Sequence, residues 1–154
     1  MKDLNSNITV GEFVTALIEY SPDTISSYEH AESKPFLNDY MHYGYDMGWL
    51  EEMDLTDRDT PLLKKNAARI AHEFIRLQLH EPDSENINAA AKMRDIYDCR
   101  VCTKHIMQMV AKGIMEGYYI TDTLYLFGIN DPVTQKEAQT IIKRIFRPNM
   151  RIIP

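Results

Sequence analysis

Residues 127–138 read Phe-Gly-Ile-Asn-Asp-Pro-Val-Thr-Gln-Lys-Glu-Ala, and this stretch decides the fold prediction. Thr134 and Glu137 have the spacing of a capping box, in which two side chains satisfy free backbone N–H groups at a helix start. The sequence therefore predicts a helix from about Thr134 to Phe146, terminated by Pro148.

Working outward from this helix, the same capping spacing recurs at Thr9 and Glu12, and it predicts a helix that ends near Pro22. Apolar residues at helical intervals predict four more helices. These cover about 36–50, 60–79, 84–92 and 101–115. The sequence places Thr60 as the cap of the 60–79 helix, with Pro61 at its first position.

Two connecting segments have their own character. Residues 51–59 are rich in Asp and Glu without the ligand spacing of a calcium loop, which predicts a solvated acidic loop. Residues 118–129 are β-branched and aromatic, which predicts a loop with a short extended piece and no obvious strand partner. Gly117 is expected to close the helix before it.

The length and composition indicate one globular domain covering residues 1–154. The helical spacing of its apolar residues predicts that this domain is all-α. Hydrophobic residues make up 44% and the net charge is −6, so a general nucleic-acid binder is not expected. No apolar run approaches the roughly 20 residues of a membrane span. The first residues lack a secretory signal, so we expect a cytoplasmic protein unless a signal has been removed.

Two parts of the chain repeat the same landmarks at the same spacing. One has Phe36, Tyr40-Met41 and Gly48-Trp49, and the other has the equivalent set Val101, His105-Ile106 and Gly113-Ile114. Gly44 and Gly48 also lie four residues apart, which predicts close approach of a neighbouring helix.

In this order of landmarks the chain resembles the S-layer homology repeat, which continues through a loop with Phe and Pro into a capped helix. The resemblance covers a partial unit at 8–20 and full units at about 30–79 and 95–147. It implies a compact pseudo-threefold assembly of helix-loop-helix units. It also implies binding of cell-wall polysaccharide, often pyruvylated, in grooves between the units. If a signal has been removed, the resemblance implies a cell-wall-associated protein.

The resemblance places Val10, Lys64 and Gln135 where the family has its groove-lining arginine. Lys64 alone keeps the positive charge, although a lysine lacks the bidentate fork of arginine. The family's tryptophan is replaced by Phe36 and Val101.

Aromatic side chains stack on sugar faces, and they also form protein cores. With Lys64, the candidate ligand-binding residues are Phe36, Tyr43 and Trp49. The expected function is therefore a non-enzymatic binding module for wall polysaccharide. The alternative is an intracellular protein-interaction or regulatory protein that has lost the sugar-binding residues.

No catalytic residues, cofactor or metal ligands are predicted. Cys99 and Cys102 form a CxxC with His105 three residues further on, but a zinc site needs about four ligands. The repeat alignment places Cys102 and His105 at packing positions. We interpret both cysteines as core residues and leave a metal or thiol site as the least favoured alternative.

Overall fold

The computed structural model describes residues 3–21 and 37–153 and shows a mostly helical fold, as predicted. The helices are α1 (Val10–Tyr20), α3 (Leu37–Asp46), α4 (Glu52–Thr56), α5 (Lys64–Leu77), α6 (Asn88–Ala91), α7 (Arg100–Ala111) and α8 (Gln135–Phe146). Short 3-10 turns cover η1 (Asp95–Asp98) and η2 (Pro148–Met150). Strands β1 (Tyr118–Tyr119) and β2 (Tyr125–Leu126) form an antiparallel hairpin.

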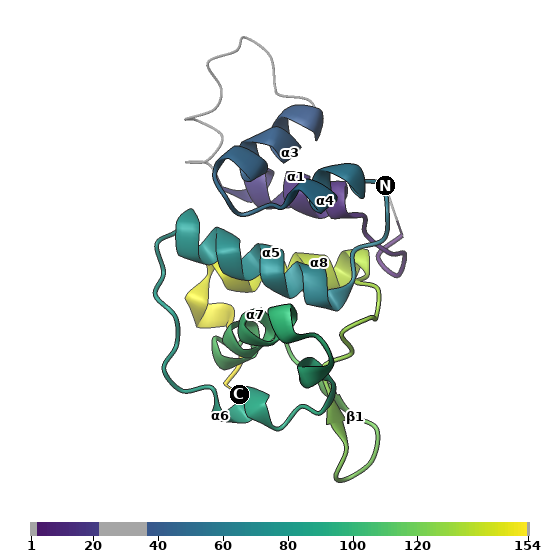
Figure 1. Cartoon of the computed structure of the whole chain (residues 1–154), viewed down its shortest axis with the longest axis vertical. Helices are drawn as coiled ribbons and strands as arrows, with labels where there is room; N and C mark the ends of the chain where they lie inside the picture. Colours follow the sequence, from purple (N-terminus) through teal and green to yellow (C-terminus); the bar gives the residue numbers. More distant parts are fainter. Residues whose placement is uncertain (1–2, 22–36, 154) are drawn as a thin grey trace.

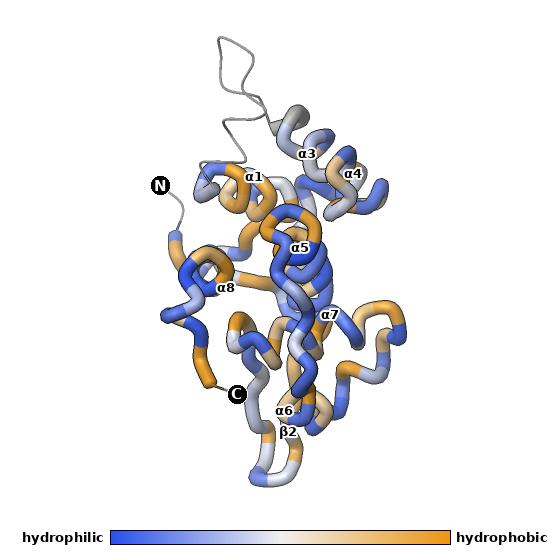
Figure 2. The backbone as a smooth tube through the Cα atoms, turned by 90° about the vertical axis from the view of Figure 1, so that its left-hand side faces the viewer, coloured by the Kyte–Doolittle hydropathy of each residue, from blue (hydrophilic) through white to orange (hydrophobic). Residues whose placement is uncertain are grey.

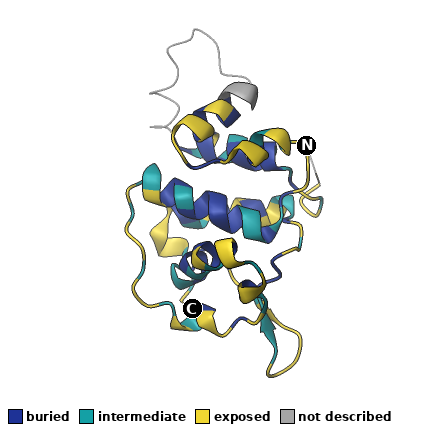
Figure 3. Ribbon diagram, in the orientation of Figure 1, coloured by how far each residue is buried: buried dark blue, intermediate teal, exposed yellow. Residues whose placement is uncertain are grey.

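Helix α5 crosses the middle of the molecule in Figure 1, with α1, α3 and α4 on one side and α6, α7 and the hairpin on the other. Its buried character is visible in Figure 3, and Figure 2 shows α8 packed near it at the same level. The core is continuous across these elements. It includes the fully buried side chains Phe13, Leu17, Trp49, Ile70, Phe74 and Phe127.

Extended segments just before α1, α5 and α8 are joined in a closed ring of backbone hydrogen bonds. The amide of Ile8 donates to the carbonyl of Val133 at 2.9 Å, Val133 donates to Leu62 at 2.8 Å, and Leu62 donates to Ile8 at 2.9 Å. All three side chains are aliphatic and buried. The ring brings three helix starts, distant in sequence, to one place.

The first amide of each of these helices is also satisfied by another of the three segments. A helix start leaves its first N–H groups without intrahelical acceptors, so such partners are needed. The bonds run from Val10 to the Thr60 carbonyl (3.1 Å), from Lys64 to Asp131 (2.9 Å) and from Gln135 to Ser6 (2.8 Å).

The turns that follow α3 and α7 repeat each other. Gly48 and Gly113 have φ values of 90° and 73°, a left-handed conformation that favours glycine. Trp49 donates its amide to Gly44 at 3.1 Å, and Ile114 donates to Met109 at 2.9 Å in the same pattern. The landmarks that share a spacing in the sequence therefore share a turn geometry.

The capping boxes at both ends of the chain are confirmed. Thr9 accepts from the amide of Glu12, and Glu12 accepts from the amide of Thr9, at the start of α1. Thr134 and Glu137 do the same at the start of α8. Because each box uses only residues three apart, local sequence is sufficient to specify it.

The predicted start of α5 was wrong. Thr60 and Pro61 belong to the extended segment, Leu63 is the N-cap residue, and the helix begins at Lys64. Thr60 followed by Pro61 locally favours a helix start at this point. The helix starts later because the Leu62 amide donates to the Ile8 carbonyl in the ring and keeps this segment extended.

The acidic segment 51–59 was also misassigned as a wholly solvated loop. It contains α4, and Asp54 is buried, with 3% of its surface exposed. Its carboxylate receives two hydrogen bonds from the Arg69 guanidinium, at 2.7 and 2.9 Å. The pairing explains the burial, since a carboxylate is rarely buried without a cationic partner.

Three further features of the structure differ from the prediction. Helix α7 ends at Ala111 with Gly113, rather than Gly117, in the left-handed turn. The extended piece in 118–129 finds its strand partner within the same segment, as the β1–β2 hairpin. Gly48 lies outside α3, and a Cβ there would meet only Leu77, at 3.4 Å, so close helix approach does not explain this glycine.

Candidate functional site

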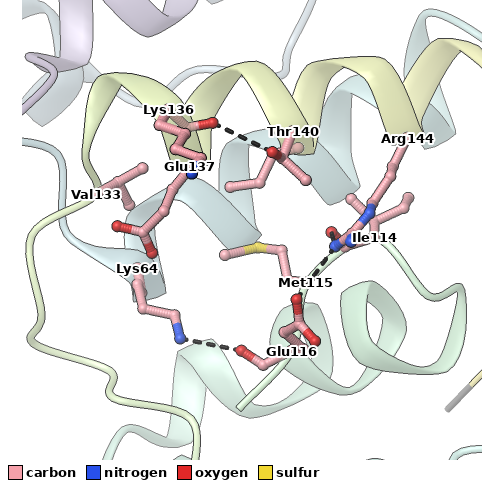
Figure 4. A pocket seen from close by; sticks show the side chains of 10 residues that line it. Lys64, Ile114, Met115, Glu116, Val133, Lys136, Glu137, Thr140 and Arg144 are labelled. Atoms are coloured by element: carbon pink, nitrogen blue, oxygen red, sulfur yellow. Dashed lines mark hydrogen bonds and ion pairs between the residues drawn. The ribbon is translucent and has the colours of Figure 1, made fainter. Parts of the chain in front are cut away.

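A groove lies between the start of α5, the turn after α7 and the side of α8. Its volume is about 330 Å³, and its lining combines charged groups with an apolar floor. Figure 4 shows Lys64 and Glu116 on one side, Glu137 and Arg144 from α8 around the opening, and Met115 between them. We call this the Lys64 groove.

Lys64 itself is nearly buried, with 8% of its surface exposed. Its ammonium donates to the carbonyl of Glu116 at 3.1 Å and to the carbonyl of Phe127. The same Nζ lies 4.4 Å from the centroid of the Phe127 ring, a cation–π distance. These contacts hold the cation at the base of the groove.

Burial lowers the pKa of Lys64, and the nearby carboxylates of Glu137, Asp131, Asp95 and Glu116 oppose this effect. An anionic ligand in the groove would act in the same direction as these carboxylates, because it favours the charged ammonium. The same carboxylates repel an anion, so a carboxylate or phosphate ligand needs Arg144 as well as Lys64.

Arg144 supplies the second cation at the groove. Its NH1 donates to the carbonyl of Ile114 at 3.3 Å and lies 3.6 Å from a carboxylate oxygen of Glu116. The Glu116 side chain is 59% exposed, so this ion pair is weak and can rearrange around a ligand. Lys136 is exposed at the mouth of the groove.

Two other hollows can be compared with the Lys64 groove, and one of them occupies an equivalent place beside the ring. The hollow between α8 and α1, of about 480 Å³, has Gln135, Glu12 and Glu19 where the Lys64 groove has Lys64, Glu137 and Arg144. The arrangement is the same, but this lining has no cation to balance its two acids, whereas the Lys64 groove has Lys64, Lys136 and Arg144 beside two acids. The hollow between α8 and α1 is therefore unsuited to an anion.

The third hollow, of about 250 Å³, lies between the turn after α3, α5 and α7. Arg69, which is paired with the buried Asp54, lines this hollow, whereas Val10, the residue aligned with Lys64, is buried and does not. The three helix starts therefore share backbone hydrogen bonding but differ in their first side chain, which is apolar in α1, cationic in α5 and a neutral amide in α8.

The sequence-predicted site residues do not gather in one place. Lys64 lines its groove, whereas Trp49 and Tyr43 lie in the core, with 1% and 8% of their surfaces exposed. The Trp49 ring packs edge-on against Phe74, with centroids 5.1 Å apart. Tyr43 accepts a hydrogen bond from Gln78 at 3.1 Å. Phe36 lies outside the described residues.

Groove residues that the sequence prediction missed are Met115, Glu116, Lys136, Glu137 and Arg144. The sequence assigned Glu137 only a capping role and gave no groove role to Arg144, which lies in the last turn of α8. The signal that could have found Arg144 is its position on the α8 face that carries Glu137 and Thr140.

The cysteines form a disulfide between Cys99 and Cys102 at the start of α7. The expected burial of Cys102 is confirmed, with 8% of its surface exposed, but the pairing itself was not predicted. His105 does not join them. Its Nδ1 lies 2.8 Å from Nδ1 of His72, a residue of α5.

Among the described residues, no helix is long and apolar enough to cross a bilayer. No protein-family model matches the chain, and neither the curated proteins nor the solved structures contain a match to it. The fold and its grooves therefore define the protein only as a mostly helical protein built around three linked helix starts.

Proposed function

We propose that this protein is a non-enzymatic binding module of S-layer homology type, and that the Lys64 groove takes a carboxylate-bearing segment of cell-wall polysaccharide. The observation that carries the proposal is the position of Lys64. Of the three aligned first residues, Val10, Lys64 and Gln135, it is the one with a positive charge, and it lies at the base of an open groove.

The surroundings of Lys64 support a sugar rather than a bare anion. Ile114, Met115 and Ile141 give the groove an apolar floor, which suits the C–H face of a sugar ring. Lys136, Thr140 and Glu116 add polar groups around the mouth that can fix hydroxyls. Two cations, Lys64 and Arg144, remain for the carboxylate.

The ring of backbone hydrogen bonds also supports the family proposal. A pseudo-threefold assembly requires three equivalent helix starts around one centre. Ile8, Leu62 and Val133 supply such a set, and the hollows lie between neighbouring units.

The experiment is co-sedimentation of the protein with Gram-positive cell walls, before and after extraction of their secondary polymer. We expect retention that is lost on extraction and reduced in Arg144→Gln. Lys143→Gln is the matched control, because Lys143 is exposed on α8 but does not line the groove. Absence of retention on both preparations, or equal losses in the two variants, would overturn the proposal and favour a protein partner.

A further inference from the structure

We infer that His72, Glu73 and His105 form a binding site for a divalent transition-metal ion that joins α5 to α7. The donor atoms of these three side chains lie within 4.8 Å of one another. Both histidines are buried, and Glu73 is partly exposed. The inference is independent of the proposed sugar binding, since the cluster lies outside the Lys64 groove.

The spacing of the donor atoms is close to that of a metal centre. Nδ1 of His72 and Nδ1 of His105 are 2.8 Å apart, and Oε1 of Glu73 lies 4.0 and 3.8 Å from them. Zinc bonds of about 2.0–2.2 Å in a tetrahedron separate neighbouring ligand atoms by roughly 3.3 Å. Shifts of about half an ångström in each direction therefore suffice to surround an ion.

Neighbouring groups already orient two of the ligands. Nε2 of His72 lies 2.7 Å from the carboxylate of Asp83, which can only accept, so Nε2 carries the proton and the Nδ1 lone pair faces the cluster. A carboxylate in this role is the usual partner of a metal-binding histidine. Arg76 donates to Oε2 of Glu73 at 2.7 Å and leaves Oε1 toward the rings.

His105 completes the set in a different way. With the His72 Nδ1 as acceptor, His105 donates its Nδ1–H in the metal-free protein. Coordination requires the other tautomer, with the proton on Nε2. Metal binding thus replaces the N–H···N hydrogen bond by two metal–nitrogen bonds, and the α5–α7 connection is kept.

An entry path and a free coordination position are also present. Glu73 and His105 line the 250 Å³ hollow described above, which opens beside the cluster. Three protein ligands leave one position of a tetrahedral ion for water or a small anion. Arg69 also lines this hollow, but its ion pair with Asp54 reduces its repulsion of a metal cation.

The ligand types select the class of ion. Two imidazoles and one carboxylate suit Zn²⁺, Co²⁺, Ni²⁺ or Cu²⁺, whereas Mg²⁺ and Ca²⁺ prefer sites made of oxygen alone. An ion held by both helices stabilises the folded protein by mass action. The expected consequence is a melting temperature that rises with Zn²⁺ concentration.

The test is calorimetric titration of the whole chain with Zn²⁺, together with its melting temperature. We expect one ion per chain, loss of binding in His105→Gln, and binding about 10–100-fold weaker in Asp83→Asn. His42→Gln is the control, because His42 is exposed on α3, away from the cluster. Asp83 is 49% exposed, so its variant reports on the site even if His105→Gln fails to fold.

Cobalt spectroscopy distinguishes this site from one built on the cysteines. With Co²⁺ we expect visible d–d bands and no thiolate-to-cobalt charge-transfer band, with the disulfide intact or reduced. A charge-transfer band would overturn the inference. So would wild-type affinity for Zn²⁺ in both Asp83→Asn and a folded His105→Gln. Binding of Mg²⁺ as tight as that of Zn²⁺ would also overturn it.

Discussion

The amide of Ile8 donates to the carbonyl of Val133 at 2.9 Å, so the segment before α1 is joined directly to the segment before α8. Leu62 completes the ring from the middle of the chain. Two of the grooves discussed above lie beside these helix starts. The ring thus places Lys64 and Gln135, the first residues of α5 and α8, each at a groove.

Replacing the turn glycines should destabilise the fold unequally. Gly48→Ala places an alanine in a left-handed backbone conformation and should lower the free energy of unfolding by about 1–2 kcal/mol. Gly113→Ala has the same strain, and its Cβ would lie 1.9 Å from the carbonyl oxygen of Ile152, so its loss should be larger. Urea unfolding measures both. Equal losses would contradict the crowding seen at Gly113.

Removing one partner of the buried Asp54–Arg69 pair should be strongly destabilising. Asp54→Ala leaves the guanidinium without its carboxylate and should cost about 3–5 kcal/mol. Asp57→Ala, at an exposed position, is the control and should change little. A similar midpoint for both variants in urea unfolding would show that Asp54 is solvated, as the sequence alone predicted.

The stability of the protein should fall in acid partly through Glu81. Burial raises the pKa of this carboxyl, but hydrogen bonds from Arg151 and Lys112 outweigh it and bring the pKa below the ordinary 4.5. A lowered folded-state pKa stabilises the fold above the unfolded value, and the contribution is lost as pH falls through the folded value.

Glu81→Gln should therefore be less stable than the wild type at pH 7, and the difference should narrow below about pH 4.5. Thermal unfolding at a series of pH values measures this. A gap that stays constant down to pH 2 would contradict the assigned role of Glu81.

Reduction of the Cys99–Cys102 disulfide should have a small effect on stability. The bridge closes a very short loop, and chain entropy assigns such a loop about 2 kcal/mol. After reduction, a thiol reagent should label Cys99 before Cys102, because Cys102 is buried and Cys99 is partly exposed. Mass spectrometry of the labelled peptides gives the order, and faster labelling of Cys102 would contradict its burial.

Much of the helical framework could be predicted because its signals are local. The apolar residues Phe13 and Leu17 of α1 recur at helical spacing and are fully buried. The end of α7 was misplaced because Gly113 and Gly117 are both plausible terminators by residue type. In the structure, Gly113 also accepts a hydrogen bond from Ile152, near the end of the chain, and local sequence does not reveal this contact.

The candidate sites were less accessible to sequence reasoning. Lys64 was found through its alignment with Val10 and Gln135, but Arg144 was not, because its groove role depends on how α8 lies against the turn after α7. His72 and His105 were separate residues in the sequence, and the packing of α5 on α7 brings their Nδ1 atoms together.

The sequence by itself determined where α1 and α8 begin, because Thr9 with Glu12 and Thr134 with Glu137 satisfy helix N–H groups within one turn. Tertiary structure decided where α5 begins. The amide of Lys64 is satisfied by the Asp131 carbonyl, a group far along the chain that becomes available only when the three segments close their ring.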